Sequence, residues 1–335
     1  MKNLRSIIIA TLLLFVLVGC SSQNEELKVY NNHFFAMDTL VQITVHSEDS
    51  DKADEAFQLA REEVERLETK LSAHIEGSDV DTITKNAGIE PVEVSEETFY
   101  LLKKGVEYGE KTDGKFDITI GPLLEAYSWS NQVVPTEKEV QQATQLVDYK
   151  KLILDEDNQT AFLTEEGMTL DLGAIAKGFI VDKAAEIMMD HGIKYGTVDG
   201  GGDVYLMDKP DGTPWRIGIQ HPRKQQGEFI GIVETYSNSV VTSGDYERYF
   251  MDGKTRIHHI IDPIEGLPPQ NVQSVTISAP NATIADTLST ALFNYSPEEA
   301  VSFVEDFDGV EVLVVDSEGQ IYKSTGMQEK VTINK

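Results

Sequence analysis

Residues 168–189 read MTLDLGAIAKGFIVDKAAEIMM, and this stretch runs from an apolar segment through small residues into a helical pattern. Met168–Leu172 is typical of a short buried strand. From Gly178 to Met189 the apolar residues recur at helical spacing, which predicts a helix with one face inward. The junction Asp171–Gly178 would let backbone or ligand approach closely, and free N–H groups at a helix start suit a phosphate. A tight turn carrying a surface lysine is the alternative interpretation.

Strands and helices surround this stretch without a regular βαβ alternation. The expected strands are Phe34–His46, a hairpin over Leu152–Leu163, Tyr195–Met207 with a glycine turn, further strands through Ile277, and a hairpin of Val310–Val315 with Gln320–Lys323. The expected helices are Asp51–Leu71, Glu96–Glu110 capped by Ser95, Ala282–Asn294 and Pro297–Phe307. This mixture favours an α+β fold with mixed or antiparallel sheets and packed helices over a doubly wound parallel sheet.

The N-terminus has the pattern of an export signal. Lys2 and Arg5 precede an apolar run, Ile7–Val18, that is shorter than the ~20 residues of a spanning helix. Cys20 follows small residues and resembles the lipobox cysteine of bacterial lipoproteins. We therefore expect a lipoprotein signal peptide at 1–19, lipidation at Cys20, a tether at 20–30 and the folded domain at 31–330, on the extracytoplasmic face of the cell membrane. An ordinary signal peptide or a short membrane anchor is the alternative.

Charge and cysteine content narrow the function further. Cys20 is the only cysteine, so the mature chain forms no internal disulfide and depends on core packing. The formal net charge is −29, which argues against nucleic acid and against electrostatic attraction to anionic lipid. An anionic substrate would be repelled by such a chain, and a bound divalent cation would offset that repulsion locally.

Several polar clusters are candidates for chemistry. His258–Pro263 is the densest titratable segment, and adjacent strand residues point to opposite faces, so we expect one histidine to face a pocket. Asp286 and Thr290 share a helix face at i, i+4, and their oxygens suit Mg²⁺. Asp199–Asp203 encloses three glycines but does not match the common nucleotide-binding fingerprints. Each cluster alone is also compatible with an ordinary turn, strand or helix cap.

Taken together and in this order, the segments resemble the bacterial FAD:protein FMN transferases, the ApbE family, from Phe34 to Ile321. The segments that carry the resemblance are Ala36–Thr39, Gly114–Leu123, Asp171–Gly178, Asp199–Asp203, Ser243–Tyr246, His259–Pro263 and Ala285–Leu292. Any one of them is ordinary, whereas all seven in the family's order are not expected by coincidence.

The resemblance implies an ApbE-like (T-fold-like) architecture for 31–330 and a Mg²⁺-dependent transfer. In that family the FMN moiety of FAD is attached to a Ser or Thr hydroxyl of an extracytoplasmic acceptor flavoprotein, and AMP is released. The FAD-binding residues it implies are Met37, His74, Lys115, Phe116, Asp117, Asp171, Lys177 and Ile261. The metal ligands it implies are the carbonyl of Ala174, the carboxylate of Asp286 and the hydroxyl of Thr290. His74 departs from the aromatic tyrosine frequent in relatives.

Transfer to a hydroxyl needs positioning, charge stabilisation and a proton acceptor. His259 is the expected catalytic base because an ordinary histidine pKa suits proton acceptance at neutral pH. Asp262 is the rival candidate. An FAD pyrophosphatase, a non-catalytic flavin-binding lipoprotein and a solute-binding lipoprotein remain the alternative functions.

Overall fold

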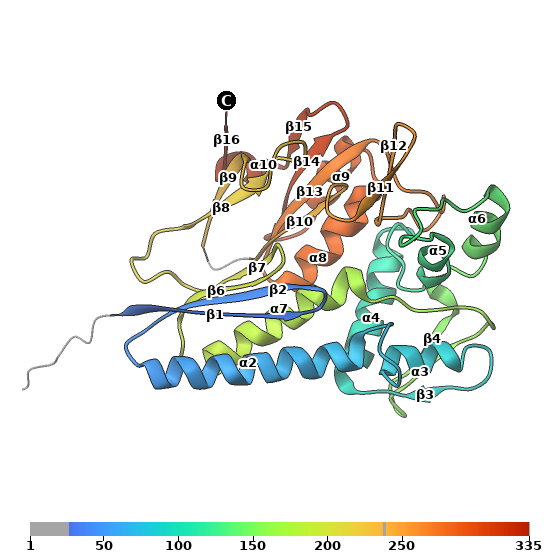
Figure 1. Ribbon diagram of the computed structural model, residues 1–335, viewed down its shortest axis with the longest axis horizontal. Helices are drawn as coiled ribbons and strands as arrows, with labels where there is room; N and C mark the ends of the chain where they lie inside the picture. Colours follow the sequence, from blue (N-terminus) through green and yellow to red (C-terminus); the bar gives the residue numbers. More distant parts are fainter. Residues whose placement is uncertain (1–26, 237–238, 335) are drawn as a thin grey trace, which may run out of the picture.

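The computed structural model describes residues 27–236 and 239–334, and its central feature is an antiparallel eight-stranded sheet (Figure 1). All neighbouring strands in this sheet pair antiparallel. In spatial order its strands are β1 (Lys28–Ala36), β2 (Thr39–Ser47), β6 (Tyr195–Gly200), β7 (Asp203–Leu206), β10 (Ser239–Gly244), β13 (Val272–Ala279), β14 (Glu311–Asp316) and β15 (Ile321–Lys323).

Helices cover one face of this sheet and bury the main hydrophobic core between them and the strands. α2 (Ser50–Leu71) and α7 (Gly173–Asp190) lie under β1, β2 and β6, while α8 (Ala282–Ala291) lies under β10 and β13 (Figure 1). α7 touches both of the other helices and so connects the two halves of the layer. The remaining helices are α3 (Asp79–Lys85), α4 (Glu96–Lys111), α5 (Gly121–Ala126), α6 (Glu137–Thr144), α9 (Pro297–Val304), α10 (Thr325–Lys330) and the 3₁₀ turns η1 (Tyr149–Lys151) and η2 (Leu292–Asn294).

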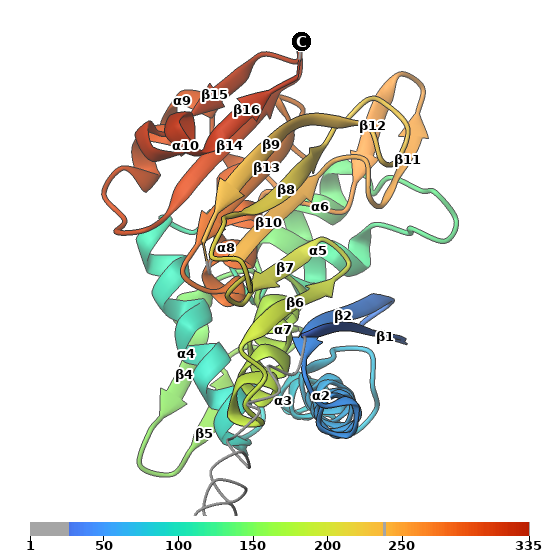
Figure 2. The ribbon, with the colours of Figure 1, turned by 90° about the vertical axis from the view of Figure 1, so that its left-hand side faces the viewer.

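Three smaller sheets complete the fold. Their strands are β3 (Val92–Glu93), β5 (Thr160–Leu163) and β4 (Leu152–Asp155) in one, β16 (Val331–Ile333), β9 (Phe229–Thr235) and β8 (Trp215–Gln220) in the second, and β11 (Tyr249–Asp252) with β12 (Thr255–His258) in the third. In the view of Figure 2, β8 and β9 pass in front of β13 and β14.

β14 shows how the sequence builds two cores from one strand. Val312 and Val314 belong to the main core, whereas Leu313 and Val315 belong to a second core with β8, β9 and β16. Side chains alternate between the faces of a strand, so a continuous apolar run is needed where both faces are covered. The small sheet therefore closes the face of β14 that the helices leave open.

The α+β class is confirmed, and so are several predicted elements. The helix predicted at 51–71 is α2, and the helix predicted at 96–110 is α4, with the Ser95 side chain accepting a hydrogen bond from the N–H of Thr98. The hairpin expected over 152–163 is formed by β4 and β5. These segments combine strong periodicity with clear turn or capping residues, so local sequence determines them.

The predicted strands at 34–46 and 168–172 differ from the structure. Phe34–His46 is not one strand, because the chain reverses at Met37 and Asp38, whose φ angles are 54° and 55°. Met168–Leu172 is not a strand of any sheet; only an isolated parallel bridge joins Thr169 to Ile120. The helix that follows begins at Gly173 rather than Gly178.

The predicted signal peptide at 1–19, Cys20 and most of the tether lie outside the described residues. β1 already begins at Lys28, within the range predicted as tether, and the last strand ends at Ile333. Within residues 27–236 and 239–334, no helix combines the length and apolar character needed to cross a membrane.

Candidate active site

The site is built where α7 crosses α8, and Gly178 sets the distance between them. A Cβ atom on Gly178 would lie 2.3 Å from the carbonyl oxygen of Ala282 and 2.8 Å from Cβ of Asp286. The missing side chain lets the Gly178 N–H donate to Oδ2 of Asp286 at 3.0 Å. The glycine is therefore required by close approach of the two helices, which brings the junction Asp171–Gly178 against the Asp286 segment.

A second contact from α7 holds the start of α8. The Asp182 carboxylate accepts hydrogen bonds from the N–H of Ala282 at 2.7 Å, the N–H of Thr283 at 2.9 Å and the hydroxyl of Thr283 at 2.5 Å. Asn281, the residue before the helix, accepts from the N–H of Ile284. Because the first N–H groups of a helix have no partner inside it, Asp182 and Asn281 together satisfy three of them.

Two buried carboxylates and one lysine form the charged centre of the site. Nζ of Lys177 lies 2.5 Å from Oδ1 of Asp203, while the Asp203 and Asp286 residues are only 1 % and 3 % exposed. Oδ2 of Asp203 is buried without a hydrogen-bond partner. Burial, followed by the charge of Asp203, raises the pKa of Asp286 to about 8. Burial alone would lower the pKa of Lys177, but the two carboxylates outweigh it and raise that pKa.

Hydroxyl groups from β10 and α8 border this centre. Oγ of Ser243 lies 2.8 Å from Oγ of Ser289 and 3.4 Å from Oγ1 of Thr290. Thr290 stands one turn after Asp286, so both present oxygen atoms on the same side of α8. In an α-helix the carbonyl of residue i faces the N–H of residue i+4, so the Ala174 carbonyl is directed to the Gly178 N–H that also meets Asp286.

These groups fit a small hard cation. A carboxylate, a hydroxyl and a carbonyl are the oxygen donors that Mg²⁺ prefers, and Mg²⁺ commonly retains several water ligands. The raised pKa of Asp286 keeps a proton on this carboxyl group at pH 7, next to the buried Asp203, and a cation that replaced the proton would compensate the charge it leaves. The described part of the chain contains no group of three or more His, Cys, Asp or Glu side chains arranged for a metal. Of the three expected ligands, only Asp286 contributes a side chain of these four residue types.

The two histidines of the titratable segment occupy different environments, since His258 ends β12 and His259 follows it in a bend. His258 is buried, its Nε2 contacts the Pro269 carbonyl at 2.8 Å, and its ring meets the edge of Phe293. His259 remains partly exposed, and its Nδ1 lies 3.3 Å from the carbonyl oxygen of Arg248. Burial of the ring, and then the charge of Arg248, lower the pKa of His259 to about 3, so the imidazole is neutral at pH 7.

Asp262 is occupied by structural contacts. Its Oδ2 lies 2.5 Å from Nζ of Lys115, and its Oδ1 accepts hydrogen bonds from the N–H groups of Ile264 and Glu265. The neighbouring Ile261 is buried in a small core with Leu123 and others. Of the two candidate bases, the neutral and partly exposed His259 has the freer lone pair.

The loop before α5 presents Lys115 but buries its neighbours. Phe116 packs edge-on against Tyr108 in the main core. The Asp117 carboxylate accepts hydrogen bonds from the N–H groups of Thr119 and Tyr149, both at 2.8 Å, and burial raises its pKa. Phe116 and Asp117 therefore stabilise the loop by internal contacts. Of the three adjacent residues predicted to bind FAD, only Lys115 directs its side chain to another predicted site residue, Asp262.

Met37 lies at the β1–β2 turn, Asp171 precedes α7, and His74 follows α2. Met37 occupies the tip of the β1–β2 hairpin, and its Cε would be 3.6 Å from a Cβ on Gly200, which lies within the Asp199–Asp203 segment. Asp171 accepts a hydrogen bond from the N–H of Gly173 at 2.7 Å and thereby starts α7. His74 is exposed on the loop after α2.

Asp203 and Asp182 hold the site together, and neither is among the predicted site residues. Asp203 ends the glycine segment 199–203, which carries part of the family resemblance, but no role of its own is predicted for this residue; an acidic residue at the start of a strand is the available signal. Asp182 was passed over within the predicted helix 178–189, where it is an acidic residue among Phe179, Ile180 and Val181. An acid in such an apolar surrounding is buried only when it has partners, which is a signal for a buried contact.

Comparisons with known proteins match this chain along most of its length. The family model described as ApbE family matches residues 37–314. The FAD:protein FMN transferase of Treponema pallidum is 30% identical over 94% of this chain and 92% of its own length. The crystal structure of the ApbE protein of Thermotoga maritima superposes with a TM-score of 0.84 at 35% identity, covering 90% of this chain and 99% of that one. The flavinyl transferase ApbE of Pseudomonas stutzeri gives 0.79 at 28% identity, covering 91% and 97%.

Proposed function

This chain belongs to the ApbE family, and from that premise we propose that it transfers the FMN moiety of FAD to an acceptor protein. The observation that carries the proposal is the oxygen-lined charged centre between α7 and α8, where Lys177, Asp203 and Asp286 meet. Such a centre suits a diphosphate together with a divalent cation, and FAD contains one diphosphate.

The proposed metal is Mg²⁺, held by the Ala174 carbonyl, the Asp286 carboxylate and the Thr290 hydroxyl. When bound, Mg²⁺ would withdraw charge from the diphosphate and stabilise the departing phosphate oxygen. Lys177 supplies a nearby positive charge, and Asp203 keeps that lysine in place and ionised. The family resemblance further implies FAD contacts from Met37, at the β1–β2 turn, and from Lys115, which pairs with Asp262.

The proposed reaction joins the acceptor Ser or Thr oxygen to the phosphorus of the FMN half. The bond between that phosphorus and the bridging oxygen breaks, AMP leaves with the bridging oxygen, and the hydroxyl proton passes to Nε2 of His259. His259 is unprotonated at pH 7, as a proton acceptor must be, but its pKa of about 3 lies far below the ordinary value from which the role was predicted. The engaged carboxylate of Asp262 supports a positioning role for that residue. A negative diphosphate nearby would favour the protonated imidazole during transfer.

Mass spectrometry of an acceptor protein incubated with this protein, FAD and Mg²⁺ tests the proposal directly. The expected result is an acceptor heavier by one FMN, with AMP released in equal amount. Release of free FMN without a modified acceptor would instead identify an FAD pyrophosphatase. Retention of intact FAD would identify a flavin-binding or solute-binding protein.

Asp286→Asn and Asp286→Ala test the metal assignment. Asn retains an oxygen for the Gly178 N–H but loses the charge, so Mg²⁺ binding should weaken and most transfer should disappear with the fold preserved. Asp190→Ala, which removes an exposed carboxylate near the end of α7, is the matched control. An unchanged Mg²⁺ dependence in both Asp286 variants would contradict the ligand assignment.

We also propose lipidation at Cys20 and a location on the extracytoplasmic face of the cell membrane, from the signal pattern at 1–19. Cells fed a labelled fatty acid should label the wild-type chain and not Cys20→Ser. Equal labelling of both would exclude Cys20 as the attachment site.

A further inference from the structure

The β1–β2 hairpin reverses at two residues that rarely adopt the backbone conformation found there. Met37 and Asp38, which form the Met37 turn, have φ angles of 54° and 55°, and Ala36 pairs with Thr39 across it. Two-residue hairpin turns with positive φ at both central residues normally contain Asn-Gly, Asp-Gly or Gly-Gly. A methionine is disfavoured there because its Cβ approaches the following carbonyl oxygen. Such strain persists only where surrounding contacts determine the conformation, and it is concentrated at functional positions.

The helix α2 provides one of these contacts. The Met37 N–H donates a hydrogen bond to Oε1 of Glu68 at 2.8 Å, between residues 31 positions apart. In a two-residue hairpin turn the closing hydrogen bonds involve the flanking residues, so the N–H of the first central residue has no partner within the hairpin. Glu68 lies in the last turn of α2, between Leu67 and Leu71, which are both buried in the main core. A firmly packed helix end therefore presents the acceptor that fixes the turn.

The side chain of Met37 meets two other segments of the site around Gly200. A Cβ atom on Gly200 would lie 2.6 Å from Cγ2 of Val181 and 3.6 Å from Cε of Met37. The carbonyl oxygen of Asp203 would lie 3.9 Å from the same point. Val181 follows Lys177 by one turn of α7, and the Lys177 side chain binds Asp203. The methyl end of Met37 therefore lies beside two of the segments that carry the charged centre.

This position suits contact with an aromatic ring of bound FAD. The charged centre is the proposed site of the diphosphate, so the rest of the dinucleotide extends over neighbouring segments. Met37 is partly exposed and packs on the main core, and its thioether is a favourable partner for an aromatic ring. The acidic side chain of Glu68 would instead repel the phosphates of FAD, which argues against a direct contact between them.

We propose that Glu68 is a positioning residue, which holds the Met37 turn in its strained conformation and thereby places Met37 against FAD. The proposal rests on the proposed function, since it concerns how the same site binds FAD. It assigns Glu68 neither a contact with FAD nor a part in the transfer of the FMN moiety. Its loss should therefore change the affinity for FAD, while the Mg²⁺ ligands and His259 remain in place.

Calorimetric titration of the full chain with FAD, in Mg²⁺ and without acceptor protein, measures this effect. Glu68→Ala should weaken FAD binding about tenfold, or about 1.4 kcal/mol, the size of one lost hydrogen bond to a charged group. Glu68→Gln retains an acceptor oxygen and should stay within about threefold of wild type. Glu65→Ala removes an exposed carboxylate from the same helix and is the matched control, with wild-type affinity expected.

Two results of this titration would overturn the proposal. One is an unchanged FAD affinity in Glu68→Ala. The other is tighter binding in Glu68→Ala and Glu68→Gln alike, which would show that the side chain acts on FAD through its charge.

A rescue variant separates an effect through the turn from a direct effect. Glycine adopts positive φ without strain, so Asp38→Gly should let the turn form with less support. In the double variant with Glu68→Ala, FAD affinity should return to within about threefold of wild type. Amide hydrogen exchange gives a readout without FAD, because exchange of the Met37 N–H should be about tenfold faster in Glu68→Ala and unchanged in Glu65→Ala. Absence of rescue, or an unchanged exchange rate in Glu68→Ala, would contradict the proposal.

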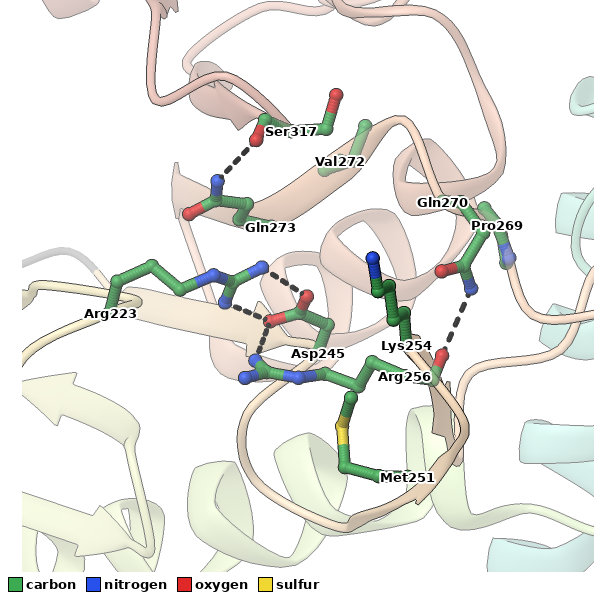
Figure 3. Close-up of a pocket in the computed structure, with 10 residues that line it drawn as sticks. All are labelled: Arg223, Asp245, Met251, Lys254, Arg256, Pro269, Gln270, Val272, Gln273 and Ser317. Atoms are coloured by element: carbon green, nitrogen blue, oxygen red, sulfur yellow. Dashed lines mark hydrogen bonds and ion pairs between the residues drawn. The ribbon is translucent and has the colours of Figure 1, made fainter.

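A separate cavity, of about 230 Å³, lies beside the β11–β12 hairpin and also carries positive charge (Figure 3). Arg223 and Arg256 both bind the carboxylate of Asp245 there, and Lys254 lines the same space. Neither partner of the hydrogen bond between the turn and α2 lines this cavity. Lys254→Ala should therefore leave FAD affinity unchanged. A loss as large as that in Glu68→Ala would place FAD in the cavity and overturn the proposal.

The transfer assay distinguishes this proposal from the proposed function. With an acceptor that is flavinylated, Glu68→Ala should raise KM for FAD and leave kcat at saturating FAD unchanged. A fall in kcat with an unchanged KM would contradict a role in binding FAD. If the wild-type chain binds FAD but modifies no acceptor, the proposed function fails, and the FAD titration still decides the role of Glu68.

Discussion

Replacing Asp182 by alanine should loosen α8 from α7 and damage the site from a distance. The Asp182 carboxylate accepts three hydrogen bonds from Ala282 and Thr283, and both of those residues are buried. In Asp182→Ala their two N–H groups and one hydroxyl would lose their partner at a place that water does not readily reach. The α8 helix carries Asp286 and Thr290, so its starting position determines where the proposed metal ligands lie.

The magnitude follows from these contacts. Leaving one buried donor unpaired costs about 1–3 kcal/mol, and breaking a buried charged contact costs about 3–5 kcal/mol. Burial raises the pKa of Asp182, so removing the carboxylate also removes a desolvation cost that offsets part of this loss. We expect the free energy of unfolding to fall by about 3 kcal/mol. Asp182→Asn, which retains one acceptor oxygen, should lose roughly half as much.

Urea denaturation followed by circular dichroism measures this loss, and calorimetric titration with Mg²⁺ measures the effect on the site. Asp190→Ala, at an exposed aspartate of the same helix, should stay within about 0.5 kcal/mol of wild type. Asn281→Ala is the second control, because it removes the helix cap from α8 itself without touching α7. The reasoning is refuted if Asp182→Ala unfolds at the wild-type urea concentration with the same dependence on urea.

Three further outcomes follow from the site. His259→Ala should slow transfer by roughly 10²–10⁴-fold, the usual contribution of a positioned base, with FAD affinity nearly unchanged; a wild-type rate would exclude His259 as the base. Gly178→Ala should destabilise the protein by about 1–3 kcal/mol, because the alanine Cβ would lie 2.3 Å from a backbone oxygen. This loss should outweigh the higher helix propensity of alanine. A higher free energy of unfolding in urea denaturation would contradict the close contact. Because the pKa of Asp286 is raised to about 8, Mg²⁺ must displace a proton from this carboxyl group at lower pH. The affinity of the protein for Mg²⁺ should therefore fall about tenfold per pH unit from pH 8 to 6. Calorimetric titration of chelator-treated protein that shows no such pH dependence would refute this prediction.

The sequence predicts the elements that local periodicity determines. α2 repeats its apolar residues at helical spacing over 22 residues, and α4 begins at a serine cap, so both were predicted nearly to the residue. The turn at Met37 and Asp38 was missed because neither residue is a glycine, although both have positive φ. The start of α7 was missed because its first turn is built from small residues and lacks a side-chain cap on the preceding Leu172.

The site likewise combines residues that local sequence identifies with contacts that only the packing of distant segments creates. Motifs identify Lys115, Asp262 and Asp286 as candidate polar residues, and the family resemblance implies roles for Lys115 and Asp286, whereas Asp262 is a candidate base on its chemistry alone. The pairing of Lys115 with Asp262 joins residues 147 positions apart, and that of Gly178 with Asp286 joins residues 108 apart. Such contacts depend on how sheets and helices pack, and a single sequence carries no local signal for them.

The arrangement of the site separates what sets its geometry from what performs the chemistry. α7 holds α8 at two points, through Asp182 at the start of α8 and through the Gly178 N–H at Asp286. Both contacts lie within the packed helix layer, so their loss should reduce stability and Mg²⁺ affinity together. His259 instead follows β12 at a partly exposed position outside that layer. Its substitution should therefore change the rate of transfer while the free energy of unfolding and Mg²⁺ affinity stay near wild type, and the two classes of variant can be told apart by measuring all three.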